Sequence, residues 1–336
     1  MLRLSRFTYH SPSSVAEAGT MLRELGPDAT LMAGGTDVLV NIKHRLVTPS
    51  HVIGISRLPE LTNVEWHTDG WLTLGAGVTL RRIESDPAIA ARFSALATSA
   101  HLVSTPQVRA TATLGGNVCL DVRCNYYNQS FDWRKAIGFC MKKDSEICRV
   151  APGGDRCWAV ASADTVPVLV ALRAEATVAG EGGDRRVPLE TLYQDDGLTP
   201  MGLEFGDIVT RIHLPPQPDV ACVYQKFRIR GSFDFPLVGI AAAVRRDRAG
   251  IVEEARLVMT AVASYPERAS AAEAALIGRR LDESTIGAAG TAIFRAAKPM
   301  DNTAGTIFHR KRMARVLAER ALRALAGIEE PARRSA

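Results

Sequence analysis

The first 57 residues carry apolar segments whose spacing changes from helical to extended. Residues 14–25 are amphipathic at helical spacing, and residues 29–32 form a short apolar run that ends in the glycines of AGGTD. Residues 37–46 return to helical spacing, and the segment VTPSHVIGIS at residues 47–56 has the character of a strand. The pattern predicts a small β–α–β unit over residues 1–57.

The longer segment of residues 58–217 alternates differently. Residues 71–80 and 111–120 each read as a strand containing glycine, and residues 81–103 between them have helical spacing. Residues 158–193 read as a buried apolar segment followed by strand. We therefore expect a second unit in which strands and helices alternate.

Residues 119–158 interrupt this second unit. The stretch CLDVRCNYYNQSFDWRKAIGFCMKKDSEICRVAPGGDRCW is poor in Val, Ile and Leu and keeps neither helical nor strand spacing. A structureless loop of this length is uncommon inside a compact domain unless something else orders it. The stretch holds five of the six cysteines of the chain.

Residues 218–327 predict a third unit. Three strand-like segments lie between residues 223 and 263, and an Ala-rich helical region follows them. The last amphipathic helix is closed by Gly327, a typical helix-ending residue. We expect the polar tail at residues 328–336 to be disordered.

Composition narrows the classes of function. The chain of 336 residues is 46% hydrophobic and has a formal net charge of +5 without a block of like charge, so nucleic-acid binding is not indicated. No run of about 18 apolar residues predicts a membrane span, and the polar N-terminal stretch does not resemble a signal peptide. We therefore expect a cytoplasmic protein, in which the clustered cysteines serve a role other than disulfide formation.

Two glycine pairs are candidates for binding a phosphate. The turn from Ala33 to Asp37 joins a predicted strand to a predicted helix, where free backbone N–H groups and the helix dipole favour an anion. Thr36 or Asp37 could cap that helix. The second pair lies in TLGGN, where Asn117 could donate to a phosphate or a ring carbonyl. A tight turn without a ligand is the alternative interpretation of each pair taken alone, but two such turns favour a dinucleotide.

Asp164 is a polar residue ahead of an apolar run. Its carboxylate could accept hydrogen bonds from two ribose hydroxyls. The alternative is an ordinary helix cap.

The cysteines of the interrupting stretch favour a metal centre. From Cys124 the spacing is C-x15-C-x7-C-x8-C, which fits neither zinc ribbons nor the common ferredoxin runs, so spacing alone does not name the metal. Seven cations against five anions between residues 121 and 157 leave a local charge of +2, which suits an anionic cluster. Free thiols on a surface loop are the alternative.

These motifs resemble a known family. AGGTD, TLGGN and SADTVP, in this order, resemble the FAD-binding medium subunits of the xanthine dehydrogenase and carbon monoxide dehydrogenase group of molybdenum hydroxylases. The cysteine-rich insertion resembles the β-subunit of 4-hydroxybenzoyl-CoA reductase, where it carries a [4Fe–4S] cluster. The resemblance implies an α+β fold, with a two-part FAD-binding domain followed by a smaller α+β domain.

The resemblance also assigns residues. It implies that the turn from Leu31 to Val38 wraps the FAD pyrophosphate and that Asp164 holds the adenosine ribose. The residues implied to contact FAD are Leu31, Met32, Ala33, Gly34, Gly35, Thr36, Asp37, Val38, Val103, Thr113, Gly116, Asn117, Asp164 and Lys226. The implied cluster ligands are Cys124, Cys140, Cys148 and Cys157. Cys119 is left out, because we expect it to pack inward from a strand, and no residue of this chain is expected to be catalytic.

The resemblance implies that the chain transfers electrons within an (αβγ)2 complex. Its partners would be a large subunit with molybdopterin and a small subunit with [2Fe–2S] clusters, and ferredoxin would be the donor for reductive dehydroxylation to benzoyl-CoA. One alternative is the FAD subunit of an oxidative xanthine, aldehyde or CO dehydrogenase-type hydroxylase. Another is a flavin- or metal-binding module with no role in electron transfer.

Overall fold

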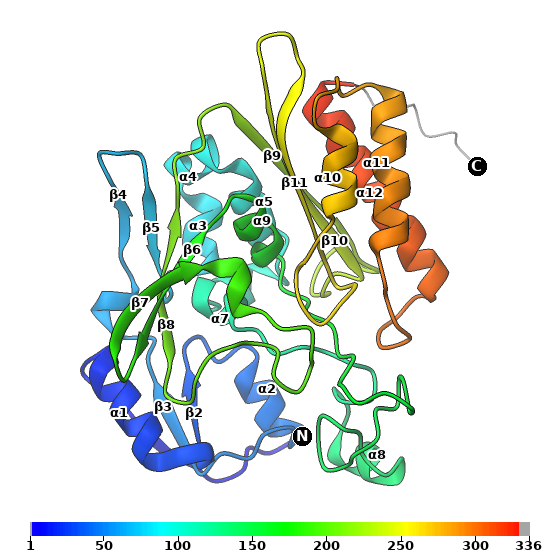
Figure 1. Cartoon of the computed structure of the whole chain (residues 1–336). Helices are drawn as coiled ribbons and strands as arrows, with labels where there is room; N and C mark the ends of the chain where they lie inside the picture. The colour runs from blue at the N-terminus through cyan, green and yellow to red at the C-terminus, as the bar shows by residue number, and fades with distance from the viewer. Residues whose placement is uncertain (1, 329–336) are drawn as a thin grey trace.

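The computed structural model describes residues 2–328 and contains three sheets along the chain (Figure 1). The first sheet is parallel, with strand order β1-β3-β2. Its strands are β1 (Thr8–His10), β2 (Ala29–Met32) and β3 (His51–Gly54). Helices α1 (Val15–Leu25) and α2 (Val38–Lys43) connect them, so the predicted β–α–β arrangement is present.

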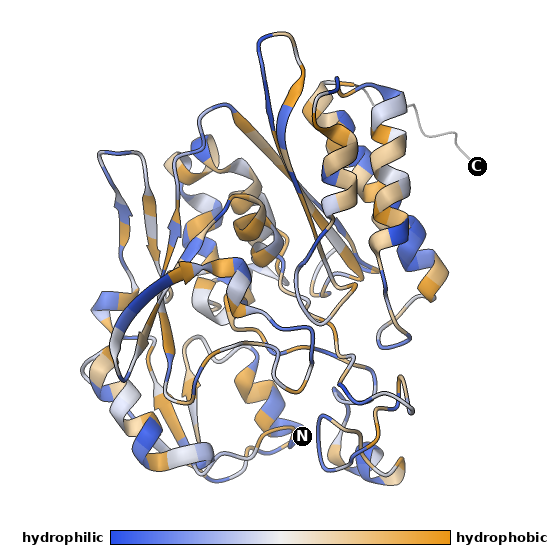
Figure 2. Ribbon diagram, viewed as in Figure 1, coloured by the Kyte–Doolittle hydropathy of each residue, from blue (hydrophilic) through white to orange (hydrophobic). Residues whose placement is uncertain are grey.

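The second sheet is antiparallel, with strand order β4-β5-β8-β6-β7. Its strands are β4 (Val64–Trp66), β5 (Leu72–Gly75), β6 (Glu175–Gly180), β7 (Gly183–Pro188) and β8 (Ile208–Leu214). The helices of this part are α3 (Leu80–Ser85), α4 (Pro87–Arg92), α5 (Ser94–His101), α6 (Pro106–Arg109), α7 (Leu114–Val118) and α9 (Thr165–Ala171). All seven residues of α9 are buried, and the ribbon of α9 has the colour of hydrophobic residues in the middle of the molecule (Figure 2).

The helical pattern of residues 81–103 is broken into separate helices. Asp86 ends α3 and caps α4, accepting hydrogen bonds from the backbone N–H groups of Ala88 and Ile89. Pro87 follows as the first residue of α4, a position where its missing N–H is harmless. The break therefore follows from a local Asp-Pro signal within a continuous apolar pattern.

The prediction of a strand at residues 111–120 is wrong. Residues Leu114–Val118 form helix α7, and the Thr113 hydroxyl caps it by accepting from the Gly116 N–H at 3.1 Å. The alternating apolar residues of this segment predict a strand. A five-residue helix is too short to show a helical period, so the Thr113 cap was overlooked. Gly115 is needed for packing, since a Cβ there would lie 2.6 Å from the Cβ of Ala76.

The third sheet and its helices form the C-terminal part, as predicted. The sheet has the order β12-β11-β10-β9, with β9 (Val220–Phe227), β10 (Val238–Arg246), β11 (Val252–Thr260) and β12 (Glu267–Arg268). Helices α10 (Ser270–Leu276), α11 (Glu283–Ala296) and α12 (Ile307–Ala326) lie beside this sheet (Figure 1). Gly327 ends α12 in the left-handed conformation. Apart from Ile328, which packs against this core, the tail predicted to be disordered lies outside the described residues.

The cysteine-rich insertion is irregular, as expected, apart from helix α8 (Phe131–Ala136). Arg134 of α8 is fully buried and donates hydrogen bonds to the carbonyls of His44 and Arg45, at 3.1 and 2.7 Å, just beyond the end of α2. The aromatic rings of Phe131 and Phe139 lie within about 6 Å of its guanidinium. One buried arginine thus seats the insertion on the N-terminal unit.

The buried residue His213 on β8 connects the two neighbouring strands of the second sheet, β5 and β6. His213 Nδ1 lies 2.9 Å from Thr73 Oγ1 on β5, and its Nε2 lies 2.7 Å from Thr177 Oγ1 on β6. Burial, aided by the nearby cations Arg186 and Arg211, lowers the pKa of His213 from 6.5 to about 4.

We expect this histidine to make the fold sensitive to acid. Between pH 6.5 and about 4 the unfolded chain binds a proton at His213 that the folded chain does not, so stability falls as the pH falls through this window. The effect of His213 on the free energy of unfolding approaches roughly 3 kcal/mol across this window, at about 1.4 kcal/mol per pKa unit. Urea unfolding of wild type and His213→Gln at several pH values measures it. An unchanged pH slope in the variant would contradict the assignment.

Candidate functional site

The first glycine turn connects β2 to α2 and lies against a neighbouring loop. Gly35 has φ +69°, a left-handed conformation that side-chain-bearing residues rarely adopt. A Cβ on Gly34 would lie 1.9 Å from the carbonyl oxygen of Thr111. Both glycines are therefore required by the backbone, one for its conformation and the other for close approach.

The expected helix caps of this turn are not formed. Asp37 occupies the cap position of α2, but its side chain makes no capping hydrogen bond. Its carboxylate instead accepts from the Asn41 amide at 2.8 Å and pairs with the Arg123 guanidinium. Asp37 thus ties the glycine turn to the segment that enters the cysteine-rich insertion.

The second glycine pair lies close to the first. Thr113, the cap residue of α7, and Asn117 within α7 are both buried, and Asn117 Oδ1 accepts from the N–H and hydroxyl of Thr165 at 3.1 and 2.6 Å. This fixes the amide of Asn117 with its oxygen occupied and its NH2 group left to donate. The orientation suits an acceptor such as a phosphate oxygen or a ring carbonyl.

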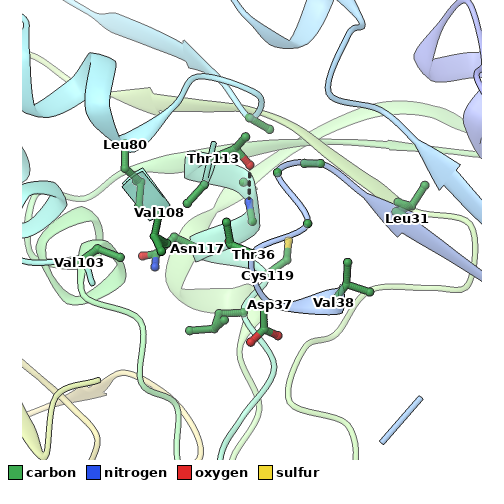
Figure 3. Close-up of a pocket in the computed structure, with 18 of the residues that line it drawn as sticks. Leu31, Thr36, Asp37, Val38, Leu80, Val103, Val108, Thr113, Asn117 and Cys119 are labelled. Carbon is green, nitrogen blue, oxygen red and sulfur yellow. Dashed lines mark hydrogen bonds between the residues drawn. The ribbon is translucent and has the colours of Figure 1, made fainter. Parts of the chain in front are cut away.

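A cavity of about 480 Å³ opens between the two turns. Figure 3 shows Thr36 of the first turn beside Asn117, with Thr113 above them, Asp37 below and Val103 at one side. Of the residues predicted to contact FAD, those that line the cavity are Leu31, Ala33, Gly34, Gly35, Thr36, Asp37, Val38, Val103, Thr113, Gly116, Asn117 and Asp164. Met32 and Lys226 are not among the lining residues.

Lys226 acts on Asp164 and does not face the cavity. Its ammonium donates to Asp164 Oδ2 at 2.8 Å and to the Leu102 carbonyl at 2.9 Å, while the Tyr224 hydroxyl donates to Asp164 Oδ1 at 2.8 Å. Both charged side chains are almost fully buried. Burial raises the pKa of Asp164 and lowers the pKa of Lys226, and their attraction only partly opposes this. Asp164 is therefore held by two donors from β9, and its side chain does not cap α9.

The sequence analysis did not predict some of the residues that line the cavity between the two glycine turns. The loop between β9 and β10 contributes Phe233, Asp234 and Phe235, of which both phenylalanines are exposed. Two phenylalanines in the polar, glycine-containing stretch RGSFDFP were an available signal, since a loop that does not pack has little use for them.

The prediction that Cys119 packs inward from a strand is wrong. It follows α7, and its side chain has accessible surface within the cavity (Figure 3). The cavity is deep enough that burial still raises the pKa of this thiol to about 12, so it stays protonated at neutral pH. Cys119 is thus a neutral neighbour of the cavity, apart from the other insertion cysteines.

The four predicted ligand cysteines line the same pocket without forming a closed group of metal ligands. Cys124, Cys140, Cys148 and Cys157 are buried, form no disulfide and line one small pocket together with Tyr127, Lys142 and Trp158. Among residues 2–328, no three His, Cys, Asp or Glu side chains form a group that could hold a metal ion. The donor set is all thiol, which suits an iron–sulfur cluster.

The protonation of the cysteine thiols decides whether this pocket suits an iron–sulfur cluster. Burial raises the pKa of Cys124 to about 12, and the neighbouring thiols Cys140 and Cys157 add to the rise. Burial also raises the pKa of Cys157 to about 11, opposed by the Ala159 N–H and the Lys142 ammonium. Burial therefore favours the protonated thiols of Cys124 and Cys157, and a bound cation would be needed to stabilise their thiolates.

Comparison with known proteins identifies the class. Residues 5–217 match the family described as the FAD binding domain in molybdopterin dehydrogenase, and residues 223–325 match the CO dehydrogenase flavoprotein C-terminal domain. The chain belongs to this family of FAD-binding subunits of molybdenum hydroxylases, whose α+β fold it shares.

Individual relatives align over nearly the whole chain. The carbon monoxide dehydrogenase medium chain of Hydrogenophaga pseudoflava is 28% identical over 95% of this chain and 96% of its own length. The aldehyde oxidoreductase FAD-binding subunit PaoB of Escherichia coli is 28% identical over 94% and 98%. A solved structure of the Hydrogenophaga enzyme superposes with a TM-score of 0.78 over 96% of this chain and 98% of that chain. No helix among residues 2–328 has the length and apolar character needed to cross a membrane.

Gly34 gives a test of the cavity. In Gly34→Ala the new methyl group would collide with the Thr111 carbonyl and push the two turns apart, so we expect FAD affinity to fall by at least about tenfold. Strain of this kind also costs about 1–3 kcal/mol of stability. Fluorescence titration with FAD and urea unfolding measure the two effects.

Gly182→Ala is the matched control, because a Cβ at Gly182 meets nothing within 4 Å. We expect this variant to bind FAD as the wild type does. Full FAD affinity in Gly34→Ala would show that the cavity does not depend on the contact between the turns.

Proposed function

We propose that this chain is the FAD-carrying electron-transfer subunit of a molybdenum-dependent oxidoreductase. The observation that carries the proposal is the cavity between the two glycine turns, with the family membership of the chain. FAD supplies the capacity to accept and pass on electrons singly or in pairs. The two named relatives are subunits of a carbon monoxide dehydrogenase and of an aldehyde oxidoreductase, which favours an oxidative enzyme in which electrons leave the molybdenum subunit through this chain.

The residues of the cavity have distinct parts in this role. The N–H groups of residues 33–36 would bind the pyrophosphate, because consecutive free N–H groups beside a helix start form an anion-binding concavity. The Asn117 amide would donate to a second acceptor of the cofactor. Asp164, held by Lys226, would accept from ribose hydroxyls. The apolar side chains of Leu80, Val103 and Val108 would exclude water from the bound group.

The four-cysteine pocket favours a second candidate, the β-subunit of a 4-hydroxybenzoyl-CoA reductase. A [4Fe–4S] cluster held by Cys124, Cys140, Cys148 and Cys157 would add a low-potential centre to the chain. Removing a phenolic hydroxyl requires transient loss of ring aromaticity, so the reaction needs strongly reducing electrons. In this candidate a ferredoxin supplies them, and they pass through this chain to the partner subunits.

Both candidates need partner subunits. A large subunit would hold the molybdopterin and the substrate, and a small subunit would hold [2Fe–2S] clusters, in an (αβγ)2 assembly for the reductase. A cytoplasmic location would keep the four thiols reduced. The substrate pocket would then lie outside this chain, and no residue here is assigned to substrate chemistry.

Metal and flavin analysis separates the candidates. We expect one FAD per chain from anaerobically purified protein in either case. About four irons with matching sulfide would favour the reductase, because that is the content of one [4Fe–4S] cluster. FAD without iron would favour the oxidative enzyme. Zinc in place of iron would exclude the cluster, and absence of FAD would refute the main proposal.

Single substitutions test the ligands. We expect Cys140→Ser to lose the cluster iron while FAD stays bound, because Cys140 lines the cysteine pocket and not the FAD cavity. Cys222→Ser and Cys119→Ser are the matched controls and should keep the iron, since neither residue lines the cysteine pocket. Iron content by colorimetric assay and FAD content by absorbance give the result. Unchanged iron in Cys140→Ser would show that the ligand set is wrong.

A further inference from the structure

One stretch of backbone separates the FAD cavity from the cysteine pocket. Arg123 and Val160 exchange both backbone hydrogen bonds, with N···O distances of 2.8 and 2.7 Å, and so form a short antiparallel bridge. Successive side chains of extended backbone point to opposite sides. Arg123 accordingly lines the FAD cavity, and the next residue, Cys124, lines the cysteine pocket.

Arg123 is placed to meet an anion in the cavity. One end of its guanidinium pairs with Asp37, directly after the first glycine turn, and its Cζ lies 4.1 Å from the ring centre of Phe235. Its Nε is buried and has no hydrogen-bond partner. A buried donor without a partner, beside an anion-binding turn, indicates a missing acceptor.

Ser162 has the same property on the same wall. It lies two residues beyond Val160, is only 3% exposed, and its hydroxyl has no partner. It lines both the FAD cavity and a small neighbouring cavity of about 10 Å³, which is at the lower limit for one water molecule. The large cavity is therefore the main space from which a partner for this hydroxyl can come.

We propose that Arg123 and Ser162 are cofactor-contacting residues on the wall shared by the two sites. Arg123 donates from Nε to an oxygen of the FAD pyrophosphate, and Ser162 hydrogen-bonds to a polar atom of the same cofactor. The inference rests on the proposed binding of FAD. Arg123 would then connect the two sites. Its guanidinium would donate a hydrogen bond to the cofactor, and its backbone is joined by a peptide bond to Cys124 of the cysteine pocket.

Titration of the full chain, freed of cofactor, with FAD and with riboflavin tests the Arg123 contact. Riboflavin lacks the phosphates, so Arg123→Gln should weaken FAD binding about ten- to hundredfold while changing riboflavin binding little. A merely structural role, such as the ion pair with Asp37, would weaken both ligands alike, and that result would overturn the Arg123 assignment. Equal FAD affinity in variant and wild type would overturn it too.

Ser162→Ala tests the second contact, with an expected loss of FAD affinity of about two- to tenfold. Ser264→Ala is the matched control: Ser264 is equally buried, but its hydroxyl already donates to the Cys157 carbonyl at 3.3 Å, so FAD affinity should not change. Unaltered affinity in Ser162→Ala would assign its partner to a water in the small cavity. Failure of the wild-type chain to bind FAD would refute the proposed function. If the wild type binds FAD and the substitutions leave its affinity unchanged, only the two proposed contacts are refuted.

Discussion

The close contact between the two glycine-bearing loops is the constraint on which the site depends. At Gly34 the backbone approaches the Thr111 carbonyl so closely that no side chain fits, and this brings the β2–α2 turn against the loop before α7. The two turns belong to different sheets, so their contact also joins the N-terminal unit to the middle of the chain. In the proposed function, an anion between the turns would meet N–H groups of the first turn and the Asn117 amide. A binding site for a long dinucleotide thus follows from a packing requirement of the backbone.

Buried polar groups hold the remaining pieces around that contact. Arg134 seats the insertion on the carbonyls beyond α2, and Arg310, fully buried in α12, donates to the Met300 carbonyl and to Asn302 in the third unit. Asn302 in turn accepts from the Asn125 N–H through its backbone carbonyl, at 2.8 Å. Because a buried arginine is stable only where several acceptors surround it, each such residue fixes one relative placement of two chain segments. The insertion is therefore positioned from both the first and the third unit.

Local signals in the sequence predicted the elements well, and long-range packing explains where they failed. The first β–α–β unit, the irregular insertion and the Gly327 helix end are visible in apolar spacing and in single residues. Helix α7 was mistaken for a strand because the alternation of apolar residues outweighed the local Thr113 cap, and the packing of Gly115 against Ala76 is visible only in the fold. That four cysteines of the insertion line one pocket was inferable because a segment without a core needs another source of order, while their role as cluster ligands stays a prediction. The pairing of Lys226 with Asp164 joins residues 62 positions apart and required the fold.

The placement of buried cations explains how two anionic groups could share one small region. Arg123 lines the FAD cavity and directly precedes Cys124 of the cysteine pocket, and Lys142 lines that pocket, bound to Asp121 at 2.9 Å and to the Gly197 carbonyl at 2.7 Å. A pyrophosphate and a thiolate-ligated cluster both carry negative charge, and their repulsion through a protein interior is poorly screened. A cation on the shared wall reduces that repulsion most where the two groups are nearest. The same backbone bridge that holds Arg123 in place also fixes the position of Cys124, so the proposed charge compensation and the proposed ligand set would depend on one short stretch of chain.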